Sequence, residues 1–147
     1  AMFLDERFLE SLHEKQKKIG LVEIIKHGLF QSPKLYDYLF DSGRDLFADN
    51  KKMKKAILWA ADLKRLCIDI DVEENENGSR RILRGGHDFS DRVEEDLKLE
   101  IPHGIAVAIG IIKQLEMEHE KQLLDKAKKL FELLDIPYTI EDYNNWK

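Results

Sequence analysis

Two histidine-bearing segments contain the residues best suited to metal chemistry. His87 follows the pair Gly85 and Gly86, and His103 follows Pro102 at the start of an apolar run. The glycines before His87 permit close approach of the backbone. At His103, the dipole of the expected helix disfavours the charged ring, and a neutral ring can donate a nitrogen lone pair to a metal. These spacings also fit structural roles, with His103 beginning a buried helix and His87 lying in a loop before one.

Glu23 and Lys26 form a second candidate, an acidic and a basic residue three positions apart. On a helix this spacing places both side chains on one face. From spacing alone, the pair is interpreted as an ordinary surface ion pair. Lys64 and Arg80 are equally ambiguous, because a solvated charge on a helix or loop explains each of them.

Hydrophobic periodicity predicts an all-α protein whose helices position these residues. The run that begins at His103 is apolar on nearly every face, which predicts the buried central helix. Ser32 with Pro33 should begin one helix, and Pro102 should stand in the first turn of another. Residues 69–86 form one long irregular connection, and such connections are often functional. The expected helices occupy residues 5–17, 20–31, 33–46, 51–68, 88–97, 103–118 and 119–134.

The composition indicates one compact domain of a cytoplasmic protein. The chain has 147 residues, of which 43% are hydrophobic and 36% charged, as is ordinary for a helical domain. Its single cysteine, Cys67, cannot form an internal disulfide, and no run of about 18 apolar residues predicts a membrane span. The net charge of −5 argues against a nucleic-acid partner.

Several segments resemble signatures of the 3-dehydroquinate synthase and sugar-phosphate cyclase family. Residues 85–94 resemble its GHTxGHAxE signature, and residues 102–110 resemble its HGEAVAIG signature, in the same order and at a similar separation. Residues 20–29 are similar to its GxxEvvKxGl segment, and residues 71–80 to its DxxE…GxR stretch. The resemblance covers nearly the whole chain up to about residue 136. It implies a helical bundle like the C-terminal domain of dehydroquinate synthase.

By position, the resemblance implies that Glu23, His87 and His103 are metal ligands. One carboxylate oxygen and two imidazole nitrogens suit Zn²⁺, or another divalent metal, with positions left open for substrate hydroxyls. The implied activity is a lyase reaction assisted by NAD. A phosphorylated sugar loses phosphate and closes into a carbocycle, with the metal acting as a Lewis acid and NAD carrying the hydride.

The remaining site residues follow from the same resemblance. Lys26 and Asp91 take catalytic positions, with Lys26 in contact with the substrate. Lys64, Arg80 and Arg84 take substrate-binding positions. A guanidinium fork matches a carboxylate or phosphate, so the arginines suit an anionic substrate.

Three residues depart from the dehydroquinate synthase pattern. Asp91 stands where the second histidine of GHTxGHA is expected, Arg84 replaces an asparagine, and Ile105 replaces the glutamate of HGE. Cyclases that make valiolone-type or gadusol-type products also lack that histidine, and a serine precedes the altered position, as Ser90 does here. Asp91 could still accept a proton or add a carboxylate to the metal.

The family's NAD-binding domain has no counterpart in the sequence, because no GxGxxG turn between a strand and a helix is present. Residues 1–147 are therefore predicted to form a single helical metal-binding domain, inactive by itself. NAD would reach the site only through a domain in cis or in trans. The expected partners are a sugar-phosphate substrate and that domain, with a homodimer also allowed and neither nucleic acid nor membrane involved.

Two alternatives from other classes stay open. His87 with Asp88 could be the centre of an HD-type metal phosphohydrolase, for which His13, His27 and Asp125 are nominal further ligands. The other alternative is a non-catalytic helical module that binds a partner or stabilises an assembly. Turnover after adding a cofactor domain in trans would count against this module.

Overall fold

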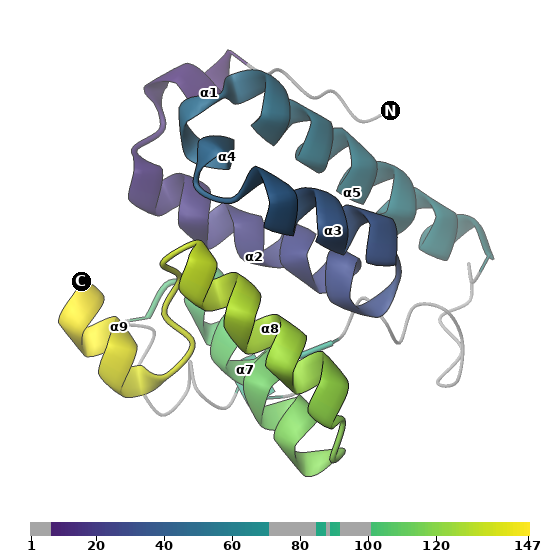
Figure 1. Ribbon diagram of the computed structural model, residues 1–147, viewed down its shortest axis with the longest axis vertical. Helices are drawn as coiled ribbons and strands as arrows, with labels where there is room; N and C mark the ends of the chain where they lie inside the picture. Colours follow the sequence, from purple (N-terminus) through teal and green to yellow (C-terminus); the bar gives the residue numbers. More distant parts are fainter. Residues whose placement is uncertain (1–6, 71–84, 88, 92–100) are drawn as a thin grey trace.

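The computed structural model describes residues 7–70, 85–87, 89–91 and 101–147, and Figure 1 shows their arrangement. Every regular element in these ranges is an α-helix, which confirms the prediction of an all-α fold. Arg80, Arg84, Asp88 and most of the predicted helix 88–97 lie outside the described residues. The helices are α1 Phe8–Ser11, α2 Glu14–Phe30, α3 Pro33–Ser42, α4 Asp45–Ala48, α5 Asn50–Ile70, α7 His103–Met117, α8 Lys121–Leu133 and α9 Ile140–Trp146.

The helix α2 lies at the centre of the main helix contacts. It packs against α3 and α5 on one side and against α7 on the other, and α8 packs on α7 (Figure 1). Since α2 and α7 lie side by side, they bring Glu23 and His103 together from positions 80 residues apart in the sequence. The core between them is apolar and includes the fully buried side chains of Leu21, Val22, Ile25, Ile105 and Ile111.

The helix α7 is buried at every residue from Gly104 to Ile112, as its apolar composition predicts. The predicted start of this helix at residue 103 is confirmed, but Pro102 does not stand in its first turn. Pro102 is the residue before the helix, with extended backbone at φ −61° and ψ 136°, so His103 is the first helical residue. His103 therefore stands where the free N–H groups of α7 converge.

Two predicted helix boundaries in the N-terminal half were also wrong. Residues 5–17 and 20–31 do not form separate helices, because α2 runs unbroken through Gly20 and the break falls earlier, at Leu12 and His13, whose ψ angles of 128° and 149° are extended. A side chain at position 20 would meet nothing within 4 Å. No close packing contact therefore requires glycine at position 20, and the helix continues through it.

Local capping explains where the shorter helices begin and end. The Ser32 hydroxyl accepts a hydrogen bond from the Leu35 amide at 3.2 Å and so caps α3 as predicted. The predicted continuation to residue 46 was wrong, because Gly43 has a φ of 50° and closes the helix. Thr139 caps α9, which lies in the tail where the sequence carried no recognised motif.

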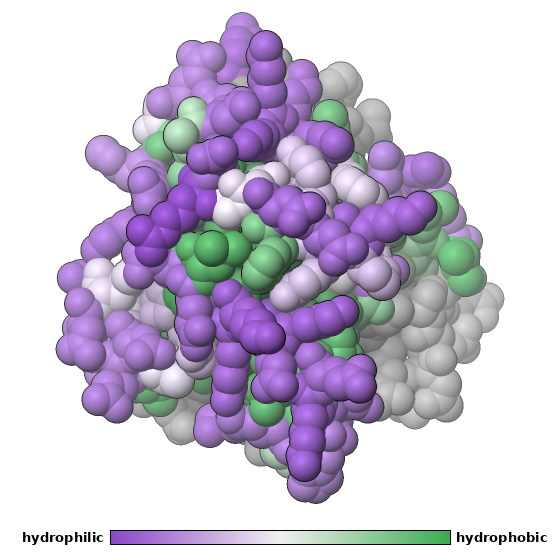
Figure 2. Space-filling view, in the orientation of Figure 1, coloured by the Kyte–Doolittle hydropathy of each residue, from purple (hydrophilic) through white to green (hydrophobic). Residues whose placement is uncertain are grey.

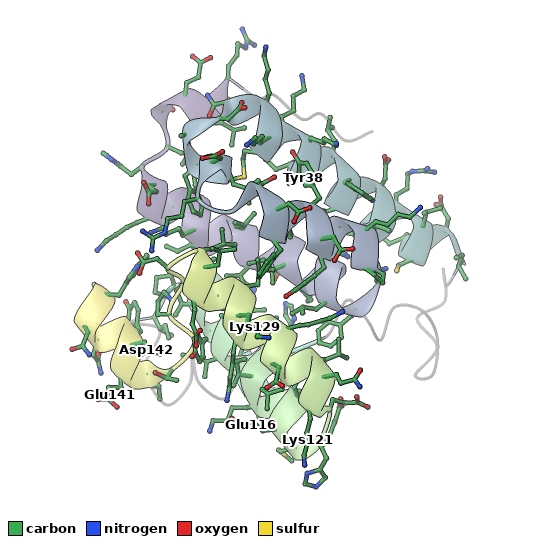
Figure 3. All side chains as sticks on the ribbon, viewed as in Figure 1. Tyr38, Glu116, Lys121, Lys129, Glu141 and Asp142 are labelled. Carbon is green, nitrogen blue, oxygen red and sulfur yellow. The ribbon has the colours of Figure 1, made fainter. Side chains whose placement is uncertain are left out.

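The outer helices direct their charges to the surface. In α8, Ala127, Leu130 and Phe131 are buried, while Lys121 and Lys129 are exposed (Figure 3). Hydrophilic residues cover most of the face in Figure 2, and apolar residues gather near its middle. Among the residues described here, no helix combines the length and the apolar character that crossing a membrane requires.

Candidate metal centre

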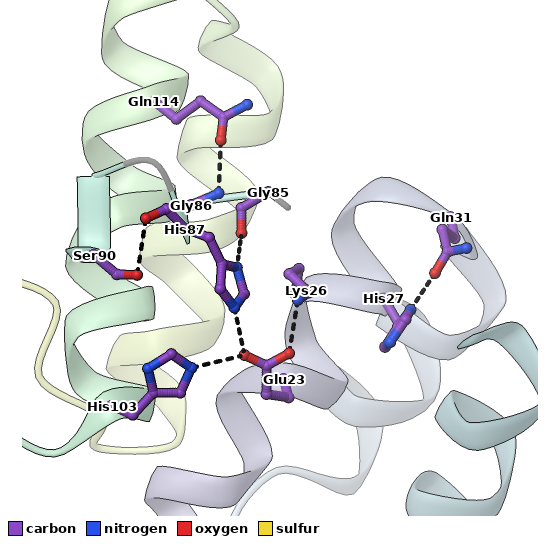
Figure 4. Close-up of polar contacts among 10 residues, drawn as sticks. All are labelled: Glu23, Lys26, His27, Gln31, Gly85, Gly86, His87, Ser90, His103 and Gln114. Carbon is purple, nitrogen blue, oxygen red and sulfur yellow. Dashed lines mark hydrogen bonds and ion pairs between the residues drawn. The ribbon is translucent and has the colours of Figure 1, made fainter. Parts of the chain in front are cut away.

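Glu23, His87 and His103 form a compact cluster of potential metal ligands. Glu23 comes from α2, His103 from the first turn of α7, and His87 from the segment that follows Gly86 (Figure 4). One ligand atom from each residue lies within 4.8 Å of the others. The structure thus brings together the three residues that the sequence predicted as ligands.

The two oxygens of the Glu23 carboxylate differ in their hydrogen bonding. Oε2 accepts a hydrogen bond from Lys26 Nζ at 2.7 Å. Oε1 is buried and accepts no hydrogen bond from the residues that the structure describes, and it lies 3.6 Å from His87 Nε2 and 4.0 Å from His103 Nε2. Two zinc bonds of about 2.0–2.2 Å can span these separations. An ion bound by all three atoms would satisfy the buried oxygen, so the donor set fits Zn²⁺.

Lys26 keeps the Glu23 carboxylate ionised. Burial alone would raise the pKa of Glu23, but the hydrogen bond and charge of Lys26, together with His87 and His103, bring the pKa below its ordinary value. Lys26 is itself only 3% exposed, so its ammonium is held against the carboxylate. A carboxylate must be deprotonated to bind a metal, and this pair maintains that state.

Backbone contacts set the orientation of the His87 ring. Nδ1 lies 3.3 Å from the Gly85 carbonyl oxygen, which leaves Nε2 directed at Glu23 (Figure 4). A backbone carbonyl in this role fixes the tautomer that presents a lone pair to the metal. The segment is tied to α7, because the Gly86 amide donates to Gln114 Oε1 at 2.7 Å. Within the segment itself, the Ser90 hydroxyl donates a hydrogen bond to the His87 carbonyl oxygen at 3.1 Å.

Glycines allow the three ligand-bearing segments to approach closely. A Cβ at Gly110 would lie 2.0 Å from the Gly86 carbonyl oxygen, and a Cβ at Gly104 would lie 2.1 Å from the Ile19 carbonyl oxygen. The first contact sets the height of the His87 segment over α7, and the second sets the separation of α7 from α2. Gly86 also has a φ of 79°, and a residue with a side chain would be strained in this conformation.

The cluster opens into a cavity of about 380 Å³ between α2 and α5. Lys26 and Lys64 bring positive charge to its wall. Asp91 is exposed and does not line this cavity, so its catalytic role stays a prediction. The described residues around the cavity are Glu23, Ile24, Lys26, His27, Ala60, Ala61, Lys64, His87 and His103.

His27 is a residue of this wall that was not predicted from the sequence. Burial lowers the pKa of His27, and its Nδ1 is hydrogen-bonded to Oε1 of Gln31. The spacing of four residues between His27, in the last turn of α2, and Gln31, the residue that ends this helix, could have indicated the contact. The contact of Gln31 with Cys67 could not be predicted from the sequence, because the two residues lie 36 positions apart.

Of the three nominal further ligands of an HD-type phosphohydrolase, His27 lines the cavity beside His87, but His13 and Asp125 are not among the described residues that line it. His13 is exposed at the start of α2, and Asp125 is exposed on α8. Within the described ranges, His87 joins Glu23 and His103 rather than either of these residues. The geometry therefore favours the cyclase-type ligand set.

Comparison with known proteins agrees with this geometry. Residues 20–145 match the family described as 3-dehydroquinate synthase C-terminal. A 3-dehydroquinate synthase from Saccharolobus solfataricus is 29% identical over 141 residues, covering 92% of this chain and 40% of that protein. One from Coxiella burnetii is 32% identical over 127 residues, covering 85% of this chain and 35% of that protein.

A solved structure extends the similarity to three dimensions. The 2-epi-5-epi-valiolone synthase from Streptomyces hygroscopicus, solved with NAD⁺ and Zn²⁺ bound, superposes with a TM-score of 0.81 at 25% identity. The match covers 94% of this chain and 40% of that protein. The chain thus spans about two fifths of the length of these relatives, and it belongs to the 3-dehydroquinate synthase family, as a C-terminal domain of that family.

Proposed function

We propose that this chain is the metal- and substrate-binding domain of a dehydroquinate-synthase-like cyclase. Such an enzyme eliminates phosphate from a sugar phosphate and closes a carbocycle. An NAD-binding domain, in the same polypeptide or in another chain, completes the site. Because the chain spans about 40% of its relatives, activity requires this second part.

The observation that carries the proposal is the buried Oε1 of Glu23, which lies near two imidazole nitrogens and has no hydrogen-bond partner within the described part of the chain. Burying an acceptor without a partner costs about 1–3 kcal/mol. A cation bound at this oxygen would remove that cost, so the metal-free site favours binding a cation. Glu23, His87 and His103 would hold Zn²⁺, which when bound polarises substrate oxygens as a Lewis acid.

The chain's own residues do the rest of the binding. Lys26 holds Glu23 ionised and directs Oε1 toward the histidines. Lys64 offers the cavity a second cation, which suits a phosphate or carboxylate on the substrate. Arg80 and Arg84 are proposed to bind the same anionic groups, and Asp91 to take up a proton during the reaction.

Reconstitution with an NAD-binding domain tests the function. The zinc-loaded chain, an NAD-binding domain from a family relative, NAD⁺ and a panel of ketose phosphates are combined, and inorganic phosphate release is measured. Release that disappears with Glu23→Ala or Lys26→Met but persists with His13→Ala is expected. His13 is a suitable control, because it is exposed and makes no capping hydrogen bond at the start of α2.

The competing function is a non-catalytic helical module. The departures at Asp91 and Arg84 from the dehydroquinate synthase pattern are the observation in its favour. A chain that binds zinc and the second domain but releases no phosphate from any ketose phosphate would support it and contradict the cyclase.

A further inference from the structure

His27 lies in the cavity wall but has no part in the ligand cluster described above. It follows Lys26 on α2, is 4% exposed and lines the same cavity as Glu23 and Lys64. Figure 4 shows one edge of its ring turned toward Gln31. A buried polar ring in a cavity wall contributes at least one directed hydrogen-bonding atom.

A chain of hydrogen bonds fixes which nitrogen of His27 carries the proton. Nδ1 is bonded to Gln31 Oε1, and Gln31 Nε2 donates to Cys67 Sγ on α5. Because the Gln31 amide donates toward Cys67, its oxygen faces the ring and Nδ1 must be the donor. Nε2 is then a lone-pair acceptor, and no described residue contributes a hydrogen bond to it.

The electrostatic surroundings keep this ring neutral. Burial lowers the pKa of His27, and the charges of Lys26 and Lys64 lower it further. The hydrogen bond to Gln31 and the charge of Glu23 raise the pKa, but the net shift is downward. A neutral ring with Nδ1 protonated offers the cavity an acceptor among groups that are mainly cations. A ligand hydroxyl, which can donate to it, is the complement.

We propose that His27 is a further substrate-binding residue, whose Nε2 accepts a hydrogen bond from a hydroxyl group of a polyhydroxylated, anionic ligand. The inference rests on the proposed function, because it places that ligand in the cavity beside the metal cluster. It adds a specificity element: Lys26 and Lys64 recognise negative charge, whereas His27 recognises a hydroxyl at a defined position.

Two ligands of similar shape separate these contributions. The zinc-loaded chain is titrated calorimetrically with myo-inositol 1-phosphate and with cyclohexyl phosphate, which shares the ring and phosphate but lacks the hydroxyls. The unsubstituted chain should bind the inositol phosphate more tightly. In His27→Phe this affinity should fall about three- to tenfold, as expected for one hydrogen bond, while the affinity for cyclohexyl phosphate and the zinc content stay unchanged. His27→Gln, which keeps an acceptor, should restore part of the preference.

The tautomer gives a second measurement that needs no substitution. The ¹⁵N spectrum of the histidine-labelled chain should show a neutral His27 protonated at Nδ1, and Gln31→Leu should release this preference. An Nε2-protonated His27, or equal binding of the two phosphates by zinc-loaded protein, would overturn the role of His27 and leave the metal site intact. A chain that binds no zinc would instead contradict the proposed function itself.

Discussion

A single methyl group added at Gly110 should disturb the metal site from inside α7. The Cβ of Gly110→Ala would lie 2.0 Å from the Gly86 carbonyl oxygen, and ordinary contact begins at 3.4 Å, so the two must separate by about 1.4 Å. The helix α7 is buried from Gly104 to Ile112 and cannot retreat. The segment that carries His87 must therefore move.

The size of this displacement sets the expected effect. Metal–ligand distances tolerate deviations of about 0.2 Å, so a shift of about 1.4 Å at Gly86 is incompatible with His87 as a ligand in its present place. We expect zinc affinity to fall by roughly 10- to 100-fold, as when a supporting contact of a metal ligand is lost. Overpacking should also cost about 1–3 kcal/mol, or roughly 3–10 °C in Tm.

The assay pairs Gly110→Ala with Gly20→Ala. Both add one methyl group to a helix, but a Cβ at Gly20 would meet nothing within 4 Å. Gly20→Ala should raise stability by roughly 0.5–1 kcal/mol and leave zinc affinity unchanged. Tm is measured on metal-free protein, and zinc affinity by competition with a chelating dye. Unchanged zinc affinity in Gly110→Ala would refute the claim that this close approach positions His87.

Three further predictions concern the contacts around the site. Lys26→Met should raise the pKa of Glu23 and weaken zinc binding about tenfold, most strongly at acidic pH, as a competition titration between pH 5.5 and 8 would show; equal affinity at every pH would contradict this. Gln114→Ala leaves the Gly86 amide without its partner and should lower stability by about 1–3 kcal/mol in urea unfolding, whereas a loss below 0.5 kcal/mol would indicate that water replaces Gln114. Because burial lowers the pKa of His27, the unfolded chain binds the proton first, so the Tm of metal-free protein should fall as pH drops below about 6.5. His27→Gln should flatten that decline, and an identical pH profile would contradict the assignment.

The sequence was sufficient for the fold class and for the order of the main helices. The apolar run after His103 could only be a buried helix, and Ser32 with Pro33 marked the start of α3. Boundaries were less accurate, because a break was expected between residues 17 and 20, where the helix continues, and none was expected at Gly43, where a helix ends. Both outcomes depend on backbone angles that residue type alone does not determine.

The ligand cluster could be predicted because Glu23, His87 and His103 lie in segments that resemble the family's signatures, whereas their spacing alone favoured structural roles. Its supports could not be predicted in the same way. The contact of Gly110 with Gly86 joins positions far apart in the sequence, and it depends on how closely two backbones approach. Hydrogen bonds such as that between Gln31 and Cys67 likewise depend on tertiary packing, which no periodic pattern encodes.

Zinc binding by the purified chain tests the central claim most directly. Zinc content and the rise in Tm on adding zinc are measured for the unsubstituted chain, for Glu23→Ala, His87→Ala and His103→Ala, and for His13→Ala as the exposed control. We expect one zinc per chain and, at a free concentration 100 times the Kd, a stabilisation of about 2.7 kcal/mol. Each ligand variant should lose both effects, and His13→Ala should keep them. A chain that contains no zinc and is indifferent to it, or ligand variants that bind zinc as well as the control does, would contradict the metal centre proposed here.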